Sequence, residues 1–367
     1  MSKSLHLCIH VIQVLPACCV NRDDTGTPKS MNYGGTRRLR ISSQCWKRAI
    51  RMYFKRKFGD TGIRTKHIVT MLADRLADDT GCSKEEASAY VRQILSKANI
   101  AAGGKKDSDN EEKKDGKKKE IKEVSAFFST QQIEAIYALI KDRFEKQTAG
   151  DEVETDNAFK NKIVAAVKET PSVSQLLFGR MFASDQSLNY DAACQVAHAF
   201  SVDKVNDEAD YFTVVGDFSV DETSAGSDYI DSKLFNSGTI YRFANVNLSE
   251  GSELLSFDGI DAGEIAADFI EAFTLAMPEG SVNSYANLTL PEMLVVELRD
   301  DEPVSFAPAF ARAVRGEDIC KEAVDKMLAY EKNVDAFYGG PVRRWVIGEN
   351  SLKEICSQVQ EEINRRI

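Results

Sequence analysis

Helix-type sequence fills one long block of this chain, and strand-type sequence lies on both sides of it. From Thr61 to about Pro171 the apolar residues recur at helical spacing, and no convincing strand pattern interrupts them. Before this block, Leu5–Ile12 alternates and predicts a half-buried first strand. After it, the run TIYRFANVNL alternates again and predicts a strand that returns to the same sheet. We therefore expect an α+β fold with a helical insertion.

The same patterns predict the remaining elements. The run AACQVAHAF and residues Ala307–Val314 predict apolar helices, while Ala262–Met277 and Leu352–Ile363 predict two further helices. The run MLVVEL predicts an apolar strand. Residues Asn206–Gly238 have apolar arms around a polar middle, which predicts a protruding hairpin or loop. In 101–123, eight lysines balance seven acidic residues with few apolar residues, and this composition predicts a disordered loop.

Two observations indicate a cytoplasmic protein. No run of about eighteen apolar residues is present, and the first residues lack the basic lead and cleavage site of a signal peptide. The eight cysteines are scattered without a CxxC pair, which fits reduced thiols.

Positive charge is concentrated in residues 21–57. This segment holds eleven Lys or Arg against two Asp, although the whole chain has a formal net charge of −10. The rest of the chain then has 36 basic and 55 acidic residues. A basic segment on an acidic body is typical of a polyanion site, and nucleic acid is the partner that we expect.

Strand and helix patterns bring these basic residues together. The alternation in 37–41 predicts a strand with Arg38 and Arg40 on the face opposite Leu39 and Ile41. Ser42 or Ser43 is expected to cap the helix that follows, which has an apolar stripe and a basic face. Asn21, Ser42, Ser43 and Gln44 add the polar donors that phosphate oxygens require. The segment therefore predicts contacts with a nucleic-acid backbone.

Two other groupings have weaker chemical interpretations. His6, Cys8 and His10 share one strand face, but packing is the favoured interpretation over a metal site because no fourth ligand is evident. Asp23 and Asp24 form a minimal part of a magnesium site, yet their setting beside a Thr-Gly turn favours turn formation. We expect no metal, no cofactor and no nucleotide-hydrolysing motif.

A set of motifs extends along nearly the whole chain. The elements NRDD, RRxRISSQxxKRA, FGRMFAS, QVAHAFSVD, ADYFT and YRxANxNL occur in this order. In this combination the chain resembles the multi-copy backbone subunit of the type I-E CRISPR Cascade complex, the CasC family. The helical middle matches only in character, and 101–123 looks like an addition.

The resemblance implies a hand-shaped protein. Its palm would have a modified RRM-like, or ferredoxin-like, fold and would comprise 1–58, 179–205 and 239–367. An inserted helical fingers domain would span 59–178, and a thumb hairpin would span 206–238.

The resemblance also implies a function without catalysis. Copies would stack head to tail along a guide RNA (crRNA), grip its backbone without sequence preference, and leave its bases free to pair with a target DNA strand in antiviral defence. Further partners would be the large, small, 5′-end capping and crRNA-processing subunits of the complex. This division fits a protein that delegates sequence recognition to base pairing.

Residues can be carried over from the family motifs one by one. The residues that would line the RNA groove are Arg22, Lys29, Arg38, Arg40, Ser42, Gln44, Lys47, Arg48 and Arg51. The residues that would lie at a displaced nucleotide are Arg180, Met181, Phe212 and Thr213.

Two alternative functions stay open. One is a metal-dependent endoribonuclease of a related complex, with Asp23 or Asp24 as the acidic residue. The other is a free-standing RNA-binding regulator that never assembles.

Overall fold

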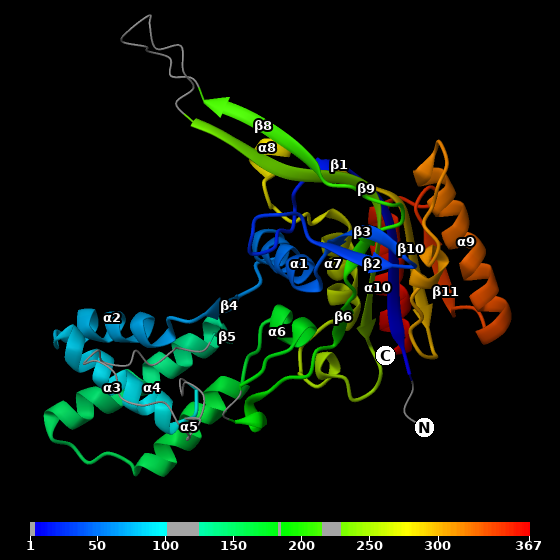
Figure 1. Ribbon diagram of the computed structural model, residues 1–367. Coiled ribbons are helices and arrows are strands. Elements are labelled where there is room, and N and C mark those ends of the chain that lie inside the picture. The colour runs from blue at the N-terminus through cyan, green and yellow to red at the C-terminus, as the bar shows by residue number, and fades with distance from the viewer. Residues whose placement is uncertain (1–3, 101–124, 183–184, 215–228) are drawn as a thin grey trace, which may run out of the picture. The chain divides into compact units, whose positions relative to one another are not determined.

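The structure is a computed structural model that describes residues 4–100, 125–182, 185–214 and 229–367. The chain divides into two compact units. Unit 1 combines Met1–Phe58 with Cys194–Ile367, and unit 2 spans Gly59–Ala193. The expected α+β class is confirmed (Figure 1). No helix among the described residues is long and apolar enough to cross a membrane.

Unit 1 is built on an antiparallel sheet whose central strands are β1 and β9. The strand order is β11-β10-β1-β9-β7-β3-β2, and β6 and β8 also pair with β9. The strands are β1 (His6–Cys18), β2 (Ser30–Tyr33), β3 (Thr36–Ile41), β6 (Cys194–Val196), β7 (Ala199–Ser201), β8 (Glu208–Val214), β9 (Tyr229–Asn247), β10 (Pro291–Arg299) and β11 (Arg343–Val346).

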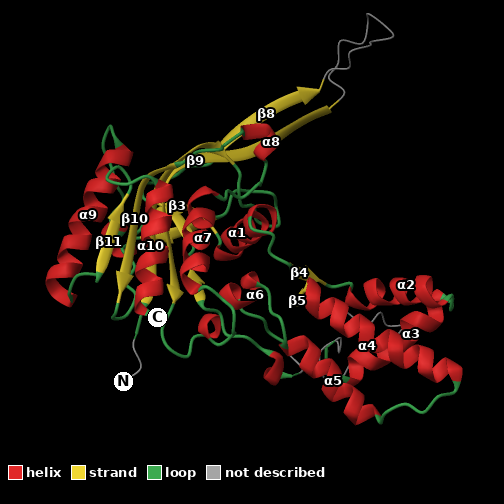
Figure 2. Cartoon of the chain, turned by 180° about the vertical axis from the view of Figure 1, so that it is seen from behind, coloured by secondary structure: helices red, strands yellow, loops and turns green. Residues whose placement is uncertain are grey.

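Helices cover both faces of this sheet (Figure 2). On one side lie α1 (Ser43–Lys57), α7 (Ala262–Leu275) and α10 (Leu352–Arg366), and on the other lies α9 (Ile319–Tyr338). The prediction of a half-buried first strand at Leu5–Ile12 is therefore wrong in two respects, because the strand is longer and its residues are buried on both faces. β1 has 13 residues, and Leu7 to Ile12 are all fully buried because both faces are packed.

The sequence patterns of unit 1 are partly confirmed. The strand from TIYRFANVNL is the second half of β9, MLVVEL lies in β10, and the helices α7 and α10 form where they were expected. The helix predicted from AACQVAHAF is wrong, because its residues pair with β9 as the short strands β6 and β7. The helix predicted at 307–314 is reduced to a single turn of 3₁₀-helix, Ala307–Phe310. The 20-residue helix α9 was not predicted.

The two arms of the hairpin predicted at 206–238 are paired strands in the structure. β8 pairs with the first part of β9 from Glu208↔Phe235 to Val214↔Tyr229, and the rest of β9 continues into the central sheet. The hairpin extends beyond the body of the sheet (Figure 1). Its polar tip, like the loop at 101–123, lies outside the described residues.

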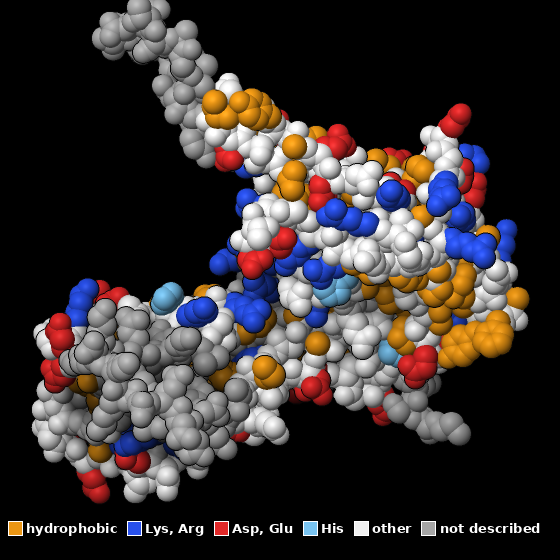
Figure 3. All heavy atoms as spheres, in the orientation of Figure 1, with side chains coloured by type: hydrophobic (Ala, Val, Ile, Leu, Met, Phe, Trp, Pro, Cys, Tyr) orange, Lys and Arg blue, Asp and Glu red, His pale blue; other side chains and the backbone are white. Residues whose placement is uncertain are grey.

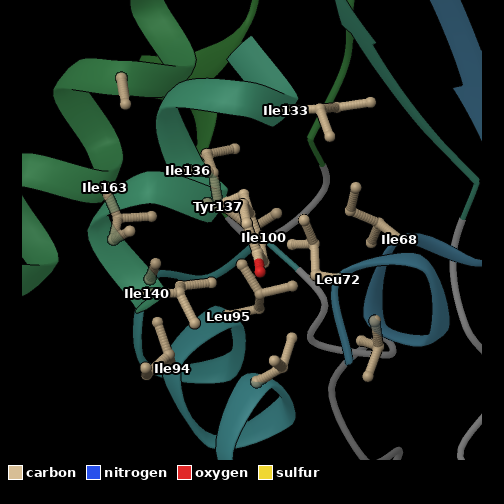
Figure 4. Packing of buried hydrophobic residues seen from close by; sticks show 14 of the residues in the cluster. Ile68, Leu72, Ile94, Leu95, Ile100, Ile133, Ile136, Tyr137, Ile140 and Ile163 are labelled. Atoms are coloured by element: carbon tan, nitrogen blue, oxygen red, sulfur yellow. The ribbon is translucent and has the colours of Figure 1, made fainter. Parts of the chain in front are cut away.

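Unit 2 is mainly helical. Its helices are α2 (Ile68–Thr80), α3 (Lys84–Lys97), α4 (Thr130–Ala149), α5 (Asp156–Lys168) and α6 (Val173–Phe178). The apolar stripes of α2, α3, α4 and α5 form one core, to which these helices contribute Leu72, Leu95, Ile136 and Ile163, one from each (Figure 4). The expectation that this region holds no strand is wrong, because β4 (Gly62–Thr65) and β5 (Ala126–Ser129) form a small antiparallel sheet.

A partly buried ionic cluster joins α9 to β10 and β11 of the sheet. The guanidinium of Arg344 on β11 lies 2.7 Å from a carboxylate oxygen of Glu331 and 2.6 Å from one of Asp335, both on α9. The same group lies 3.5 Å from the fully buried carboxylate of Glu297 on β10. Burial raises the pKa of Glu331 to about 7, with Glu297 and Asp335 adding to the rise and Arg344 opposing it.

This raised pKa predicts a pH dependence of stability. The folded state retains a proton on Glu331 that the unfolded state, with a pKa of 4.5, releases at lower pH. The contribution of this protonation to the free energy of unfolding is therefore fully present below the unfolded-state pKa. It is lost as the pH rises through the folded-state pKa. Between about pH 5 and 8, the free energy of unfolding of the wild type should fall by about 1 to 3 kcal/mol relative to Glu331→Gln. Urea unfolding across this range measures the difference.

Glu349→Gln is the matched control, because Glu349 is exposed. It should follow the wild-type profile. Parallel profiles for the wild type and Glu331→Gln would contradict the assignment.

Candidate nucleic-acid interface

The loop between β1 and β2 is fixed at its base by hydrogen bonds. The Asn21 carbonyl accepts from the Lys29 backbone N–H at 2.8 Å, and the Asn21 side-chain oxygen accepts from the Ser42 backbone N–H at 2.9 Å. The Lys29 carbonyl in turn accepts from the Arg40 N–H at 2.9 Å. Asn21 thus joins the loop to the end of β3 and the beginning of α1.

The tip of this loop is organised by Asp23. One carboxylate oxygen accepts hydrogen bonds from the Thr25 N–H at 2.9 Å, the Thr25 hydroxyl at 2.8 Å and the Thr27 N–H at 2.9 Å. The Thr25 hydroxyl bond, followed by the backbone bonds, lowers the pKa of Asp23. The favoured prediction of a turn-forming Asp23 is confirmed. Among the described residues, no group of three or more His, Cys, Asp or Glu side chains is arranged to hold a metal ion.

Helix α1 presents an almost continuous basic surface. Ser42 caps it, since its hydroxyl accepts from the Cys45 N–H at 3.3 Å, and the helix contains no acidic residue. Trp46, Ile50, Tyr53 and Phe54 are buried. The basic residues of α1 that are exposed or half-buried are Lys47, Arg48, Arg51, Lys55, Arg56 and Lys57. The three in the last turn also interact favourably with the C-terminal end of the helix dipole.

Loop, strand and helix contribute to one surface, which we call the basic patch. Its members are Arg22, Lys29, Arg40, Gln44, Lys47, Arg48 and Arg51. Lys and Arg side chains are gathered over α1 and the neighbouring strands in Figure 3. The Lys29 backbone N–H bonds to Asn21, whose side-chain oxygen accepts from the backbone N–H of Ser42, the cap of α1. Lys29 is therefore connected through Asn21 to the beginning of α1.

His198 is a neighbour of the patch that the sequence did not indicate. It is exposed on the link between β6 and β7, with its Nδ1 3.4 Å from a guanidinium nitrogen of Arg40. Burial, followed by the charges of Arg40 and Lys29, lowers its pKa. The imidazole is therefore neutral at pH 7. It was missed because its stretch was predicted to be a helix.

Arg38, unlike Arg40, is not part of the basic patch. It is fully buried, and its guanidinium donates hydrogen bonds to four backbone carbonyl groups, those of Ser201, Val202, Asp203 and Phe310. These bonds connect β3 with the end of β7 and with the 3₁₀ turn. The prediction that Arg38 lines the groove thus gives way to a structural role, because no part of its charge faces solvent.

The solved structures and the family models identify relatives of this chain. A family model described as "CT1975-like protein" matches residues 7–365. The chain is a member of this CT1975-like family. A chain of a "CRISPR RNA-guided surveillance complex, pre-nicking" is 30% identical with a TM-score of 0.77, over 99% of this chain and 100% of that one. A chain of a "CRISPR RNA-guided surveillance complex" is 28% identical with a TM-score of 0.69, over 98% and 99% of the two chains. No curated protein sequence matches.

In this CT1975-like chain, the residues expected at a displaced nucleotide belong to different units. Met181 is in unit 2 and is 77% exposed, while half-buried Phe212 and exposed Thr213 lie on β8 of unit 1. Arg180, also in unit 2, is buried over the Tyr190 ring and donates to the carbonyls of Leu188 and Val167. The structure therefore gives Arg180 a structural role within unit 2.

The contrast between Arg38 and Arg40 predicts that their substitutions differ in their effect on stability. Arg38→Met should lower the free energy of unfolding by about 2 kcal/mol or more, because the Ser201 and Phe310 carbonyls lose the Arg38 donor and a buried carbonyl left without a donor costs roughly 1 to 3 kcal/mol. Arg40→Met should stay within about 0.5 kcal/mol of the wild type, as is usual for surface changes. Urea unfolding measures both, and a loss for Arg38→Met as small as the one expected for Arg40→Met would show that Arg38 is not structural.

Proposed function

We propose that this chain is an RNA-binding subunit of a CRISPR RNA-guided surveillance complex and that the basic patch holds the backbone of its guide RNA. The observation that carries the proposal is the gathering of exposed and half-buried cationic side chains on one surface of a chain with net charge −10. The nearly full-length likeness to chains of such complexes supports it. The family match to residues 7–365 supports it as well.

The chemistry of the patch suits phosphates. Guanidinium and ammonium groups neutralise phosphate oxygens without distinguishing bases, so binding through them is independent of sequence. The loop between β1 and β2 carries only two acidic residues, Asp23 and Asp24. The carboxylate of Asp23 already accepts hydrogen bonds within the turn at the tip of this loop. A protein of this kind leaves sequence recognition to pairing between the guide and a target DNA strand.

We further propose the assembly that is typical of the type I-E backbone subunit. Several copies would then share one RNA, with the β8–β9 hairpin as the thumb that reaches the RNA on a neighbouring copy. The hairpin supports this because Tyr211 and Ile230 are large hydrophobic side chains that are 66% and 56% exposed. Met181, Phe212 and Thr213 would meet a nucleotide in that assembly. The other subunits of the complex would be further partners.

Binding without catalysis is part of the proposal. Asp23 holds the loop turn. Among the described residues, Asp24 belongs to no group of three or more His, Cys, Asp or Glu side chains that could hold a metal ion. Complementary RNA incubated with the assembled complex and Mg²⁺ should therefore remain intact. Cleavage that is lost in Asp24→Asn would support the endoribonuclease instead.

Charge reversal on α1 tests the function directly. In the triple variant Lys47→Glu, Arg48→Glu, Arg51→Glu, single-stranded RNA should bind much more weakly. The slope of log affinity against log salt should fall by roughly 2, since each phosphate contact contributes about 0.7 for single strands. Fluorescence anisotropy across a salt series measures both quantities.

The matched control reverses Lys321, Lys326 and Lys332 on α9, which changes the net charge by the same amount. It should keep the wild-type slope and most of the affinity. Equal losses in the two triple variants would show that only total charge matters, and an unchanged α1 variant would contradict the proposed site.

A further inference from the structure

His198 is held beside the basic patch by the sheet on both sides of it. The backbone N–H of Ala197, one residue earlier, donates to the Phe243 carbonyl of β9 at 2.9 Å. Phe200, two residues later, pairs with Arg40 of β3. The backbone at His198 is therefore fixed, while its imidazole is exposed.

The contact between His198 and Arg40 defines the protonation state of the imidazole. Nδ1 of His198 lies 3.4 Å from a guanidinium nitrogen of Arg40. A guanidinium group has only donors, so Nδ1 is the acceptor of this hydrogen bond. An imidazole that accepts at Nδ1 is neutral and carries its proton on Nε2. His198 thus has one N–H donor, at Nε2, and helps to orient the guanidinium of Arg40.

The surroundings of His198 keep it neutral. The charged groups that act on it are Arg40 of β3 and Lys29 of the loop, and no acidic group among the described residues does so. The neighbouring strand β9 contributes a backbone contact. On the side of α1, Lys47 acts on Cys194 of β6 and is also a cation. A proton on His198 would therefore add a positive charge to a site that already holds several.

A bound phosphate reverses both conditions. Its oxygens accept from the guanidinium of Arg40, so that Nδ1 of His198 is no longer needed as the acceptor. Its negative charge offsets Arg40 and Lys29, and a nearby anion favours the protonated imidazole. A proton from solvent can then occupy Nδ1. The resulting imidazolium has two N–H donors for phosphate oxygens.

We propose that His198 is a further phosphate contact of the basic patch and takes up one proton from solvent when RNA binds. This inference rests on the proposed function and adds a dependence on pH to the binding of the RNA backbone. RNA raises the pKa of His198, so the gain in affinity is fully present below the pKa of the free protein. The gain is lost as the pH rises through the pKa of the complex.

The test measures the binding of oligouridine RNA by fluorescence anisotropy at constant ionic strength. Neither uracil nor the phosphodiester changes its charge in the range in which histidine titrates, about pH 5 to 8. Wild-type affinity should rise by roughly three- to tenfold from the alkaline to the acid end, since one unit of pKa difference corresponds to tenfold. The slope of log affinity against log salt should be steeper by about 0.7 at the acid end, because one more phosphate is neutralised.

Three variants identify the titrating group. His198→Gln keeps a neutral donor and should lose most of the pH dependence, remaining near the wild-type affinity of the alkaline end. His198→Lys is charged at every pH tested and should bind across the range as tightly as the wild type does at the acid end. His67→Gln is the matched control, because it removes an exposed histidine of unit 2. It should keep the wild-type pH profile.

A spectroscopic measurement reads the proton directly. The imidazole Cε1–H resonance of His198 is identified by its absence from the spectrum of His198→Gln. It should titrate at a higher pH with bound oligouridine than without.

The inference is overturned if this resonance titrates at the same pH with and without RNA. It is also overturned if His198→Gln keeps the wild-type pH profile of binding, or if His67→Gln loses it equally. Melting temperatures above the assay temperature at each pH show that the variants are folded. If the wild type binds no oligouridine in a salt-dependent way at any pH, the proposed function itself fails, and the inference fails with it.

Discussion

The pairing of β9 with its neighbours is the interaction on which the rest of unit 1 depends. β9 pairs with β1 along the centre of the sheet, with β6 and β7 beside the basic patch, and with β8 in the hairpin. Its Arg242 is fully buried, stacks 3.8 Å from the centre of the Trp46 ring of α1, and donates at 2.6 Å to Gln13 of β1. Burial lowers the pKa of Arg242 to about 9, so the group is still charged at neutral pH. The helix that carries the patch is thus fixed to the strand that also forms the hairpin.

Arginine has two separate uses in this chain. Arg38, Arg180 and Arg242 are buried and bind carbonyl groups and aromatic rings, whereas Arg22, Arg40 and Arg48 keep charge at the surface. The buried groups gain from several hydrogen bonds that offset the cost of removing a cation from water. The exposed groups would lose counterions when RNA binds, so affinity through them depends on salt. Stability and binding can therefore be changed independently.

Much of the fold could be predicted from the sequence, and the misses have physical causes. Alternation identified the second half of β9, and the helical spacing of apolar residues identified α7 and α10. The stretch 192–200 failed because its small apolar residues fit a helix equally well, and only pairing with β9 makes it two strands. The loop, β3 and α1 could be assigned to one surface, but alternation alone could not show that a second layer, the 3₁₀ turn at Phe310, covers Arg38. The position of His198 beside Arg40 depends on a tertiary contact and left no local signal in the sequence.

Chemical footprinting of lysine and arginine side chains tests the central claim most directly. The protein is labelled with an amine acylating reagent and a dicarbonyl reagent, with and without bound RNA, and modified peptides are quantified by mass spectrometry. The account predicts that RNA protects Lys29, Lys47, Arg22 and Arg48, while labelling of Lys321 and Lys332 on α9 is unchanged. Equal labelling of the patch in both samples, or protection centred on α9, would contradict it.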